Sequence, residues 1–225
     1  MEEGKTPDCS TERGSNYPKK VKGRGLLGSS GIVSAFTMLS RILGLLRDVV
    51  LARVIGAGAL ADVFFVAFKI PNFFRRLFSE GAFSQAFIPV LGEYRERGGQ
   101  SLVRELVSRV FGNLGLILLV VSVSVVLFSP LVTAIFAPRW YLDSPEKFSA
   151  TAAMLRITFP YLFFISLTGF AAGILNTYDR FAVPAFTPLL LNLTLISAAL
   201  IAAPWFEEPT FALAWGVLCA GAIQF

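Results

Sequence analysis

The chain has 225 residues, 55% of them hydrophobic, and a mean hydropathy of +0.66, whereas a typical soluble protein is about 45–50% apolar; this excludes a soluble globular domain as the main body. The net charge of +5 would favour a nucleic-acid ligand in a soluble protein, but the basic residues gather in the expected loops, so no nucleic-acid partner is predicted. Two cysteines and no histidine exclude a disulfide scaffold, histidine-based catalysis and histidine-ligated metals, so we expect no enzyme, metal or cofactor.

Residues 1–28 are expected to form a disordered, basic tail in the cytoplasm. Lys, Arg, Pro, Gly and Ser predominate in this tract and apolar residues are few, so it cannot bury a core. It is not a secretory signal, because Glu2, Glu3 and Asp8 stand near its start and no short apolar core with a cleavage site follows. The membrane part is therefore predicted to occupy residues 29–225.

Six apolar segments are predicted to cross the membrane, so the predicted fold class is all-α integral membrane. A bilayer core of about 30 Å is spanned by about 20 helical residues. Four stretches contain no Asp, Glu, Lys or Arg, the last of them slightly short: 110–138, 157–178, 181–206 and 209–225. Two earlier segments are apolar but contain charges. The predicted helices are 31–56, 59–92, 102–137, 150–177, 183–206 and 210–225.

The distribution of Lys and Arg predicts a cytoplasmic N-terminus. Cytoplasmic loops of membrane proteins carry an excess of Lys and Arg. With the N-terminus inside, the basic residues on the cytoplasmic side are Lys5, Arg13, Lys19, Lys20, Lys22, Arg24, Arg95, Arg97, Arg104, Arg109 and Arg180. The opposite side then holds only Arg139 and Lys147, so most of the basic residues lie on the cytoplasmic side.

Arginines recur every six residues in the first predicted helix, at Arg41, Arg47 and Arg53. An Arg at the centre of a lipid-facing helix costs about 2.5–3.5 kcal/mol, so we expect Arg41 and Arg47 to face a water-filled cavity. Arg53 lies near the helix end and can extend to the membrane surface. Six residues turn a helix by about 240°, so the three do not form one stripe. Asp48 shares a face with Arg41 and can also neutralise Arg47.

The second predicted helix carries Lys69, Arg75, Arg76 and Glu80, with Pro71 and Gly81 on either side of the paired arginines. Pro71 removes a backbone donor, so a break is predicted between Pro71 and Gly81. Arg76 and Glu80 are four residues apart and share a face, which permits a structural ion pair. The other interpretation leaves at least one guanidinium able to bind phosphate, because two arginines outnumber one carboxylate.

Two further polar residues have structural interpretations. Asp62 opens the second predicted helix, where an acidic group is favoured by the helix dipole. Asn192 lies inside the fifth predicted helix and is expected to form a hydrogen bond to a neighbouring helix.

Several runs of sequence resemble the MurJ (MviN) family of bacterial lipid II flippases, and the resemblance covers roughly residues 30 to 225. The runs are Ser40 to Asp48, Gly56 to Gly58, Asp62 to Asn72, Arg75-Arg76, Gly81 to Val90, Gly173 to Thr177 and Pro184 to Pro188. This resemblance implies a MATE-like transporter of the MOP superfamily in the bacterial cytoplasmic (inner) membrane. Two helical lobes of such a transporter enclose a cavity that opens alternately to either side.

The resemblance also implies the substrate and the binding residues. The family moves lipid II, an undecaprenyl-pyrophosphate-linked muropeptide, between the membrane leaflets for peptidoglycan synthesis. Its essential cavity residues fall on Arg41, Arg47, Arg75, Arg76 and Glu80, with Asp48, Asp62 and Lys69 as supporting residues. The expected partners are lipid II and membrane lipids.

Family members are longer than this chain, so we expect only the N-terminal lobe, with a C-terminal lobe missing. Three alternatives remain open. Another MOP-superfamily transporter, such as a polysaccharide-lipid flippase or a drug antiporter, is one, although a cationic-drug antiporter should carry more carboxylates at membrane depth. A membrane enzyme acting on polyprenyl phosphates usually needs acidic metal motifs or a histidine. A non-transporting scaffold would use the charges only to pair helices.

Overall fold

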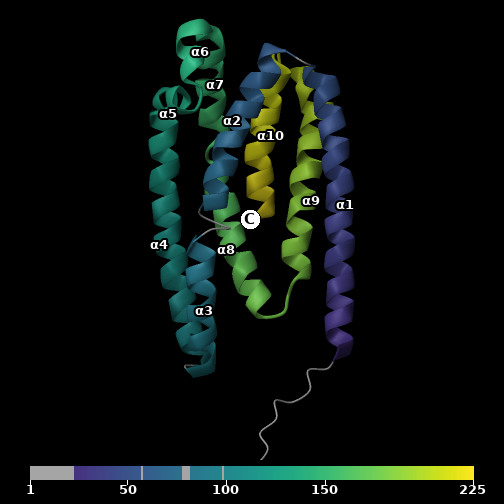
Figure 1. The fold of residues 1–225 in the computed structure, drawn as a ribbon, viewed down its shortest axis with the longest axis vertical. Coiled ribbons are helices and arrows are strands. Elements are labelled where there is room, and N and C mark those ends of the chain that lie inside the picture. Colours follow the sequence, from purple (N-terminus) through teal and green to yellow (C-terminus); the bar gives the residue numbers. More distant parts are fainter. Residues whose placement is uncertain (1–22, 57, 78–81, 98) are drawn as a thin grey trace, which may run out of the picture.

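The computed structural model describes residues 23–56, 58–77, 82–97 and 99–225, and every regular element in those ranges is helical (Figure 1). The predicted all-α fold is thereby confirmed. In chain order the elements are α1 (Gly23–Ile55), α2 (Ala59–Arg75), α3 (Ala82–Arg97), α4 (Gly99–Leu127), α5 (Ser129–Phe136), α6 (Pro138–Asp143), α7 (Pro145–Thr158), α8 (Tyr161–Thr177), α9 (Ala182–Ser197), the π-helical turn η2 (Ala198–Ala202), the 3₁₀ turn η3 (Ala203–Trp205) and α10 (Pro209–Gln224).

The first helix begins earlier than expected. Residues 23–28 were assigned by composition to the tail, but α1 starts at Gly23 and includes them. A glycine inside a helix costs only about 1 kcal/mol relative to alanine, so the glycines of this stretch do not stop a long helix from extending. The remainder of the predicted tail, residues 1–22, lies outside the described residues.

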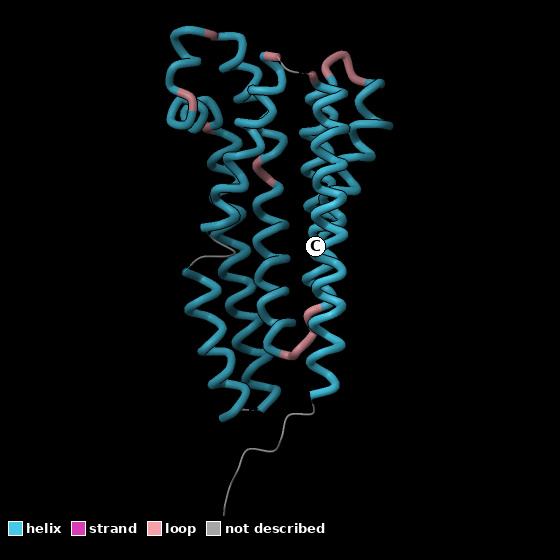
Figure 2. The backbone as a smooth tube through the Cα atoms, turned by 45° about the vertical axis from the view of Figure 1, so that its right-hand side comes forward, coloured by secondary structure: helices cyan, strands magenta, loops and turns pink. Residues whose placement is uncertain are grey.

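Several predicted crossings consist of more than one element. The second is divided into α2, which ends at Arg75, and α3, which starts at Ala82, so the break predicted between Pro71 and Gly81 is confirmed. The fourth is divided into α7 and α8, which meet at a 40° bend where Pro160 follows Phe159. Figure 2 shows this bend as a short loop within the length of the molecule, whereas most other loops lie at its two ends.

Among the described helices, two runs are long and apolar enough to cross a membrane, Gly99–Leu127 and Ala182–Trp205, and the bent pair would make a third. The predicted count of six crossings therefore stays a prediction. Large apolar side chains such as Met38, Leu45 and Leu116 point outward from α1 and α4. A bilayer would cover such surfaces, which in water would mark an interaction site.

Two clusters of buried side chains hold the helices together. The first joins α1, α2, α7, α8, α9 and α10 and includes Phe64, Leu195 and Val217. The second joins α2, α3, α4, α7 and α8 and includes Leu91 and Leu118. Because α2, α7 and α8 contribute to both clusters, the two groups of helices form one packed body, in which α10 lies between α2 and α9 (Figure 1).

The last helix packs closely because small residues line its buried face. A Cβ atom added at Gly216 would lie 2.6 Å from the Cβ of Ala198 and 3.6 Å from Leu195 Cδ2. Transmembrane helices associate through such close van der Waals contacts, because the hydrophobic effect does not drive helix association in lipid. Gly216 therefore sets the distance between α10 and the end of α9.

Gly216→Ala should destabilise the protein by about 1–3 kcal/mol, because the added methyl group must push α10 away from Ala198. Gly115→Ala is the matched control, since a Cβ at Gly115 meets no atom within 4 Å and alanine favours the helix. Thermal unfolding midpoints of the two variants in detergent measure the difference. Equal midpoints would contradict the packing described for α10.

Candidate functional site

Arg47 connects α1 to α9 through the side chain of Asn192. Arg47 Nη1 donates to Asn192 Oδ1 at 2.9 Å, and Asn192 Nδ2 donates to the Ser40 carbonyl oxygen at 3.0 Å. Asn192 is 5% exposed, so these bonds lie between the two helices. The expectation that Asn192 forms an interhelical hydrogen bond is confirmed.

Asp48 neutralises Arg47. Arg47 Nε and Nη2 donate to the same carboxylate oxygen of Asp48, at 3.0 and 2.8 Å. Of the two arginines within the expected reach of Asp48, Arg47 is the one that forms a described ion pair with it. The Arg47 side chain is 22% exposed and that of Asp48 63% exposed, so the pair is open to its surroundings on one side.

Arg75 lines a pocket of about 370 Å³ between α2, α3, α8 and α9. The residue stands in the last turn of α2, one turn after Pro71, and its Nε donates to Asn72 Oδ1 at 3.4 Å. The rest of the wall consists of Ile88, Ile165, Thr168, Gly169, Ala172, Gly173, Asn176, Pro184, Thr187 and Pro188. Among the described residues of this wall Arg75 alone carries a charge, and the others are apolar or neutral polar residues.

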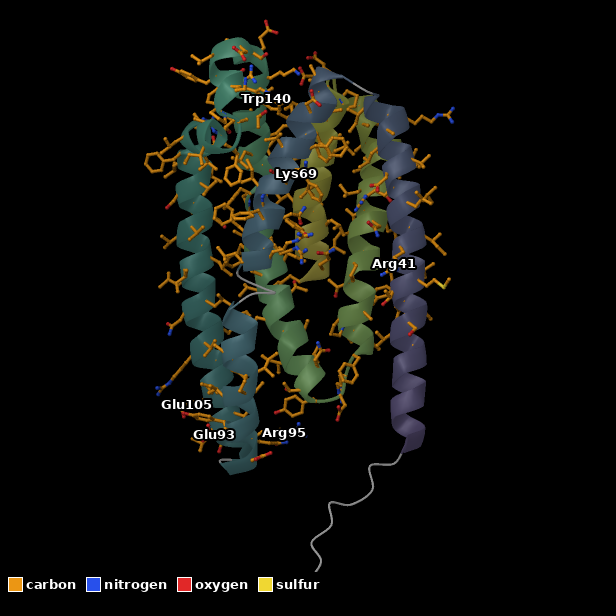
Figure 3. The ribbon with its side chains drawn as sticks, in the orientation of Figure 1. Arg41, Lys69, Glu93, Arg95, Glu105 and Trp140 are labelled. Atoms are coloured by element: carbon orange, nitrogen blue, oxygen red, sulfur yellow. The ribbon has the colours of Figure 1, made fainter. Side chains whose placement is uncertain are left out.

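The other predicted binding residues are more dispersed. Arg41, Lys69 and Arg76 are exposed. Figure 3 shows Arg41 on α1 and Lys69 on α2, both between the two ends of the molecule, at a depth where a charge needs water or a partner. Glu80 lies outside the described residues. The convergence of Arg41, Arg47, Arg75 and Arg76 on one cavity therefore stays a prediction.

The two supporting carboxylates lie elsewhere, around a pocket of about 580 Å³ between α1 and α2. Asp48 and Asp62 both line it, together with apolar residues such as Leu51. Asp62 is in the first turn of α2, as expected, and it accepts a hydrogen bond from Lys147 Nζ at 3.1 Å. The negative charges and Arg75 thus line different pockets.

Arg156, which lies in α7, is not among the predicted binding residues. Arg156 Nε donates to Ser129 Oγ at 2.8 Å, and Ser129, the first residue of α5, is fully buried. The signal was present in the sequence, since a lone arginine inside a predicted membrane helix carries the same insertion cost as Arg47. Its hydrogen bond joins α7 to α5, which indicates a structural role.

Metal chemistry has no support in the described part of the chain. In residues 23–56, 58–77, 82–97 and 99–225, no three His, Cys, Asp or Glu side chains lie close enough together to hold a metal ion.

Apolar side chains face outward from the helices and arginines form hydrogen bonds between the helices, as expected of an integral membrane protein. A family model described as Lipid II flippase MurJ matches residues 51–225. The chain belongs to the MurJ family.

Individual relatives agree with this assignment. The probable lipid II flippase MurJ of Vibrio cholerae is 50% identical over 206 residues, which cover 89% of this chain and 39% of that protein. The lipid II flippase MurJ of Burkholderia cenocepacia is 45% identical over 193 residues, covering 86% of this chain and 37% of that protein. This chain therefore spans less than half the length of these relatives.

A solved structure supports the fold as well. The structure of lipid II flippase MurJ in an inward closed conformation superimposes on this chain with a TM-score of 0.72 at 31% sequence identity. The match covers 85% of this chain and 40% of the solved chain. The predicted fold, a transmembrane lobe of this transporter class, is confirmed.

Water should reach the pocket beside Arg75, because its described wall contains a guanidinium and neutral polar side chains. Gly173 lines this pocket and a Cβ there meets no atom within 4 Å. With Cys9 and Cys219 changed to Ser, Gly173→Cys should react with a polar maleimide in membrane vesicles. Gly112→Cys, at an equally open position on α4 that is not part of this pocket, should react far more slowly. Equal labelling rates would contradict a hydrated pocket.

Proposed function

We propose that this chain is the N-terminal lobe of a lipid II flippase in the bacterial cytoplasmic membrane. The observation that carries the proposal is the position of Arg75, a cation in the wall of a pocket between α3, α8 and α9. The names of the relatives from Vibrio cholerae and Burkholderia cenocepacia support lipid II as the substrate.

The proposed chemistry is exchange of water for fixed donors around the lipid II pyrophosphate. A guanidinium offers a planar fork of N–H donors that fits phosphate oxygens, and such charge-assisted hydrogen bonds are the strong ones. Arg41, Arg47, Arg75 and Arg76 would supply these donors as pyrophosphate enters the membrane. Glu80 would hold Arg76 in place and keep the empty cavity from retaining anions too tightly.

Transport itself is proposed for a longer protein. A C-terminal lobe would complete the cavity, and the two lobes would open it first to the cytoplasmic side and then to the outer side. The relatives' extra length supports such a second lobe, since this chain corresponds to 39% of the Vibrio cholerae protein. The lobe described here would bind substrate but would not move it alone.

The orientation is proposed from charge. The end of α3 lies at one end of the molecule, where Figure 3 shows Arg95, and Arg104 and Arg109 lie in the first turns of α4. The opposite end, near Trp140 in Figure 3, carries Arg139 and Lys147 together with Asp143 and Glu146. The excess of basic residues at the first end supports a cytoplasmic N-terminus.

A scaffold that uses charges only to pair helices is the second candidate, and the contacts of Arg47 with Asp48 and Asn192 favour it. The two candidates differ in what a charge removal should do. Loss of a pairing charge lowers the amount of assembled protein, whereas loss of a binding charge leaves assembly intact and removes transport.

Arg76→Ala and Glu80→Ala should each abolish growth rescue when this lobe, fused to a matching C-terminal lobe, replaces the native flippase in depleted cells. Membrane levels should stay normal, because neither change is expected to break helix packing. Arg75→Lys and Arg76→Lys should rescue partly, since lysine keeps the charge without the fork of donors. Full rescue by both alanine variants would favour the scaffold.

Gly173→Leu should also abolish rescue, because Gly173 lines the pocket beside Arg75, a Cβ there meets no described atom within 4 Å, and the longer side chain would fill the pocket. The expected loss is of activity and not of stability. Gly112→Leu is the matched control, with the same change of size in a helix at a position open to its surroundings. If Gly173→Leu rescues as well as Gly112→Leu, the pocket is not part of the transport route.

A further inference from the structure

We propose that Asn192 is a positioning residue that directs the Arg47 guanidinium toward the lipid II pyrophosphate. The inference rests on the proposed function and adds to it a residue on α9 that does not itself touch the substrate. Three observations support it. They are the hydrogen bonds of the Asn192 amide, the N–H groups of Arg47 that these bonds do not use, and the position of Gly44 beside the amide.

Both polar ends of the Asn192 side-chain amide form hydrogen bonds, one with a donor and the other with an acceptor. The Oδ1 atom accepts from Arg47 and the Nδ2 group donates to the Ser40 carbonyl. A rotated amide would place NH₂ against the guanidinium and oxygen against the carbonyl, and neither pair can bond. The buried amide therefore has one orientation, which fixes the position of the Arg47 Nη1 atom relative to the α1 backbone.

The bonds of Arg47 leave donors for a ligand. A guanidinium has five N–H groups, and the structure gives Arg47 three hydrogen bonds, two to Asp48 and one to Asn192. One N–H on Nη1 and one on Nη2 are not used by these three bonds. Since the side chain is 22% exposed, these two groups can meet an oxyanion, and their direction follows from the two contacts that hold the others.

The Asn192 amide lies close to the α1 backbone beside Gly44. Gly44 lies one turn before Arg47 on α1, and a Cβ there would lie 3.7 Å from Asn192 Nδ2, an ordinary van der Waals contact. The amide is thus near enough to α1 to reach the Ser40 carbonyl, and a side chain larger than alanine at position 44 would crowd it. The neighbouring buried residues of α9, Leu189 and Leu195, are apolar, so a leucine at position 192 would suit the packing but could not hold the guanidinium.

A double-mutant cycle on the complete two-lobe protein tests the inference, with the affinity for purified lipid II and the thermal unfolding midpoint as readouts. Asn192→Leu should weaken lipid II binding about tenfold, a loss at the lower end for one hydrogen bond to a charged group. In an Arg47→Gln background the same change should weaken binding less than about twofold, because no guanidinium remains to be directed. Asn192→Ala, which cannot overpack the helix contact, should behave in the same way.

Thr158→Val is the control for a structural tie. Thr158 Oγ1 donates to the Ala67 carbonyl at 3.1 Å between α7 and α2, and Thr158 is fully buried. This change should lower the unfolding midpoint and leave lipid II affinity unchanged. Equal affinity losses from Asn192→Leu in both backgrounds would make Asn192 a structural residue only and overturn the inference.

The outcomes separate this inference from the proposed function. If Arg47→Gln alone binds lipid II as tightly as the parent protein, the proposed role of Arg47 in substrate binding fails. If Arg47→Gln weakens binding but Asn192→Leu and Asn192→Ala do not, the proposed function stands and the positioning role of Asn192 is wrong.

Discussion

The cost of a guanidinium in lipid is the constraint on which the rest of this structure depends. Each arginine within the helices needs a carboxylate, a polar side chain or water, and the described residues show more than one solution. Arg47 has Asp48 and Asn192, and Arg156 has the buried Ser129. Arg75 bonds to Asn72 and also lines a pocket, so part of its surroundings is open space between four helices.

Close packing and interrupted helices create that open space. Gly216 lets α10 approach the end of α9, and the Asn192 amide lies beside Gly44 of α1. The division into α2 and α3 places Arg75 in the last turn of α2, and the pocket begins at that turn. Irregular backbone at membrane depth is tolerated where it lines a cavity, and such breaks mark binding sites in many transporters.

Among the described residues, two carboxylates and Arg75 line different pockets. Asp48 and Asp62 line a pocket between α1 and α2, whereas the described residues that line the pocket beside Arg75 include no carboxylate. A carboxylate in contact with a guanidinium, as Asp48 is with Arg47, cancels part of the attraction for an anion.

The sequence by itself determined the all-α membrane fold and the break after Pro71, because apolar length and proline act locally along the chain. The arginines chosen as substrate-binding residues stay a prediction. Composition failed at Gly23, where glycines that suggested a tail continue α1. Only the tertiary structure decided that Arg47 bonds to a residue 145 positions away and that Arg156 bonds to Ser129. Such partners depend on which helices pack together, and helix packing brings distant residues into contact in a way that no local pattern records.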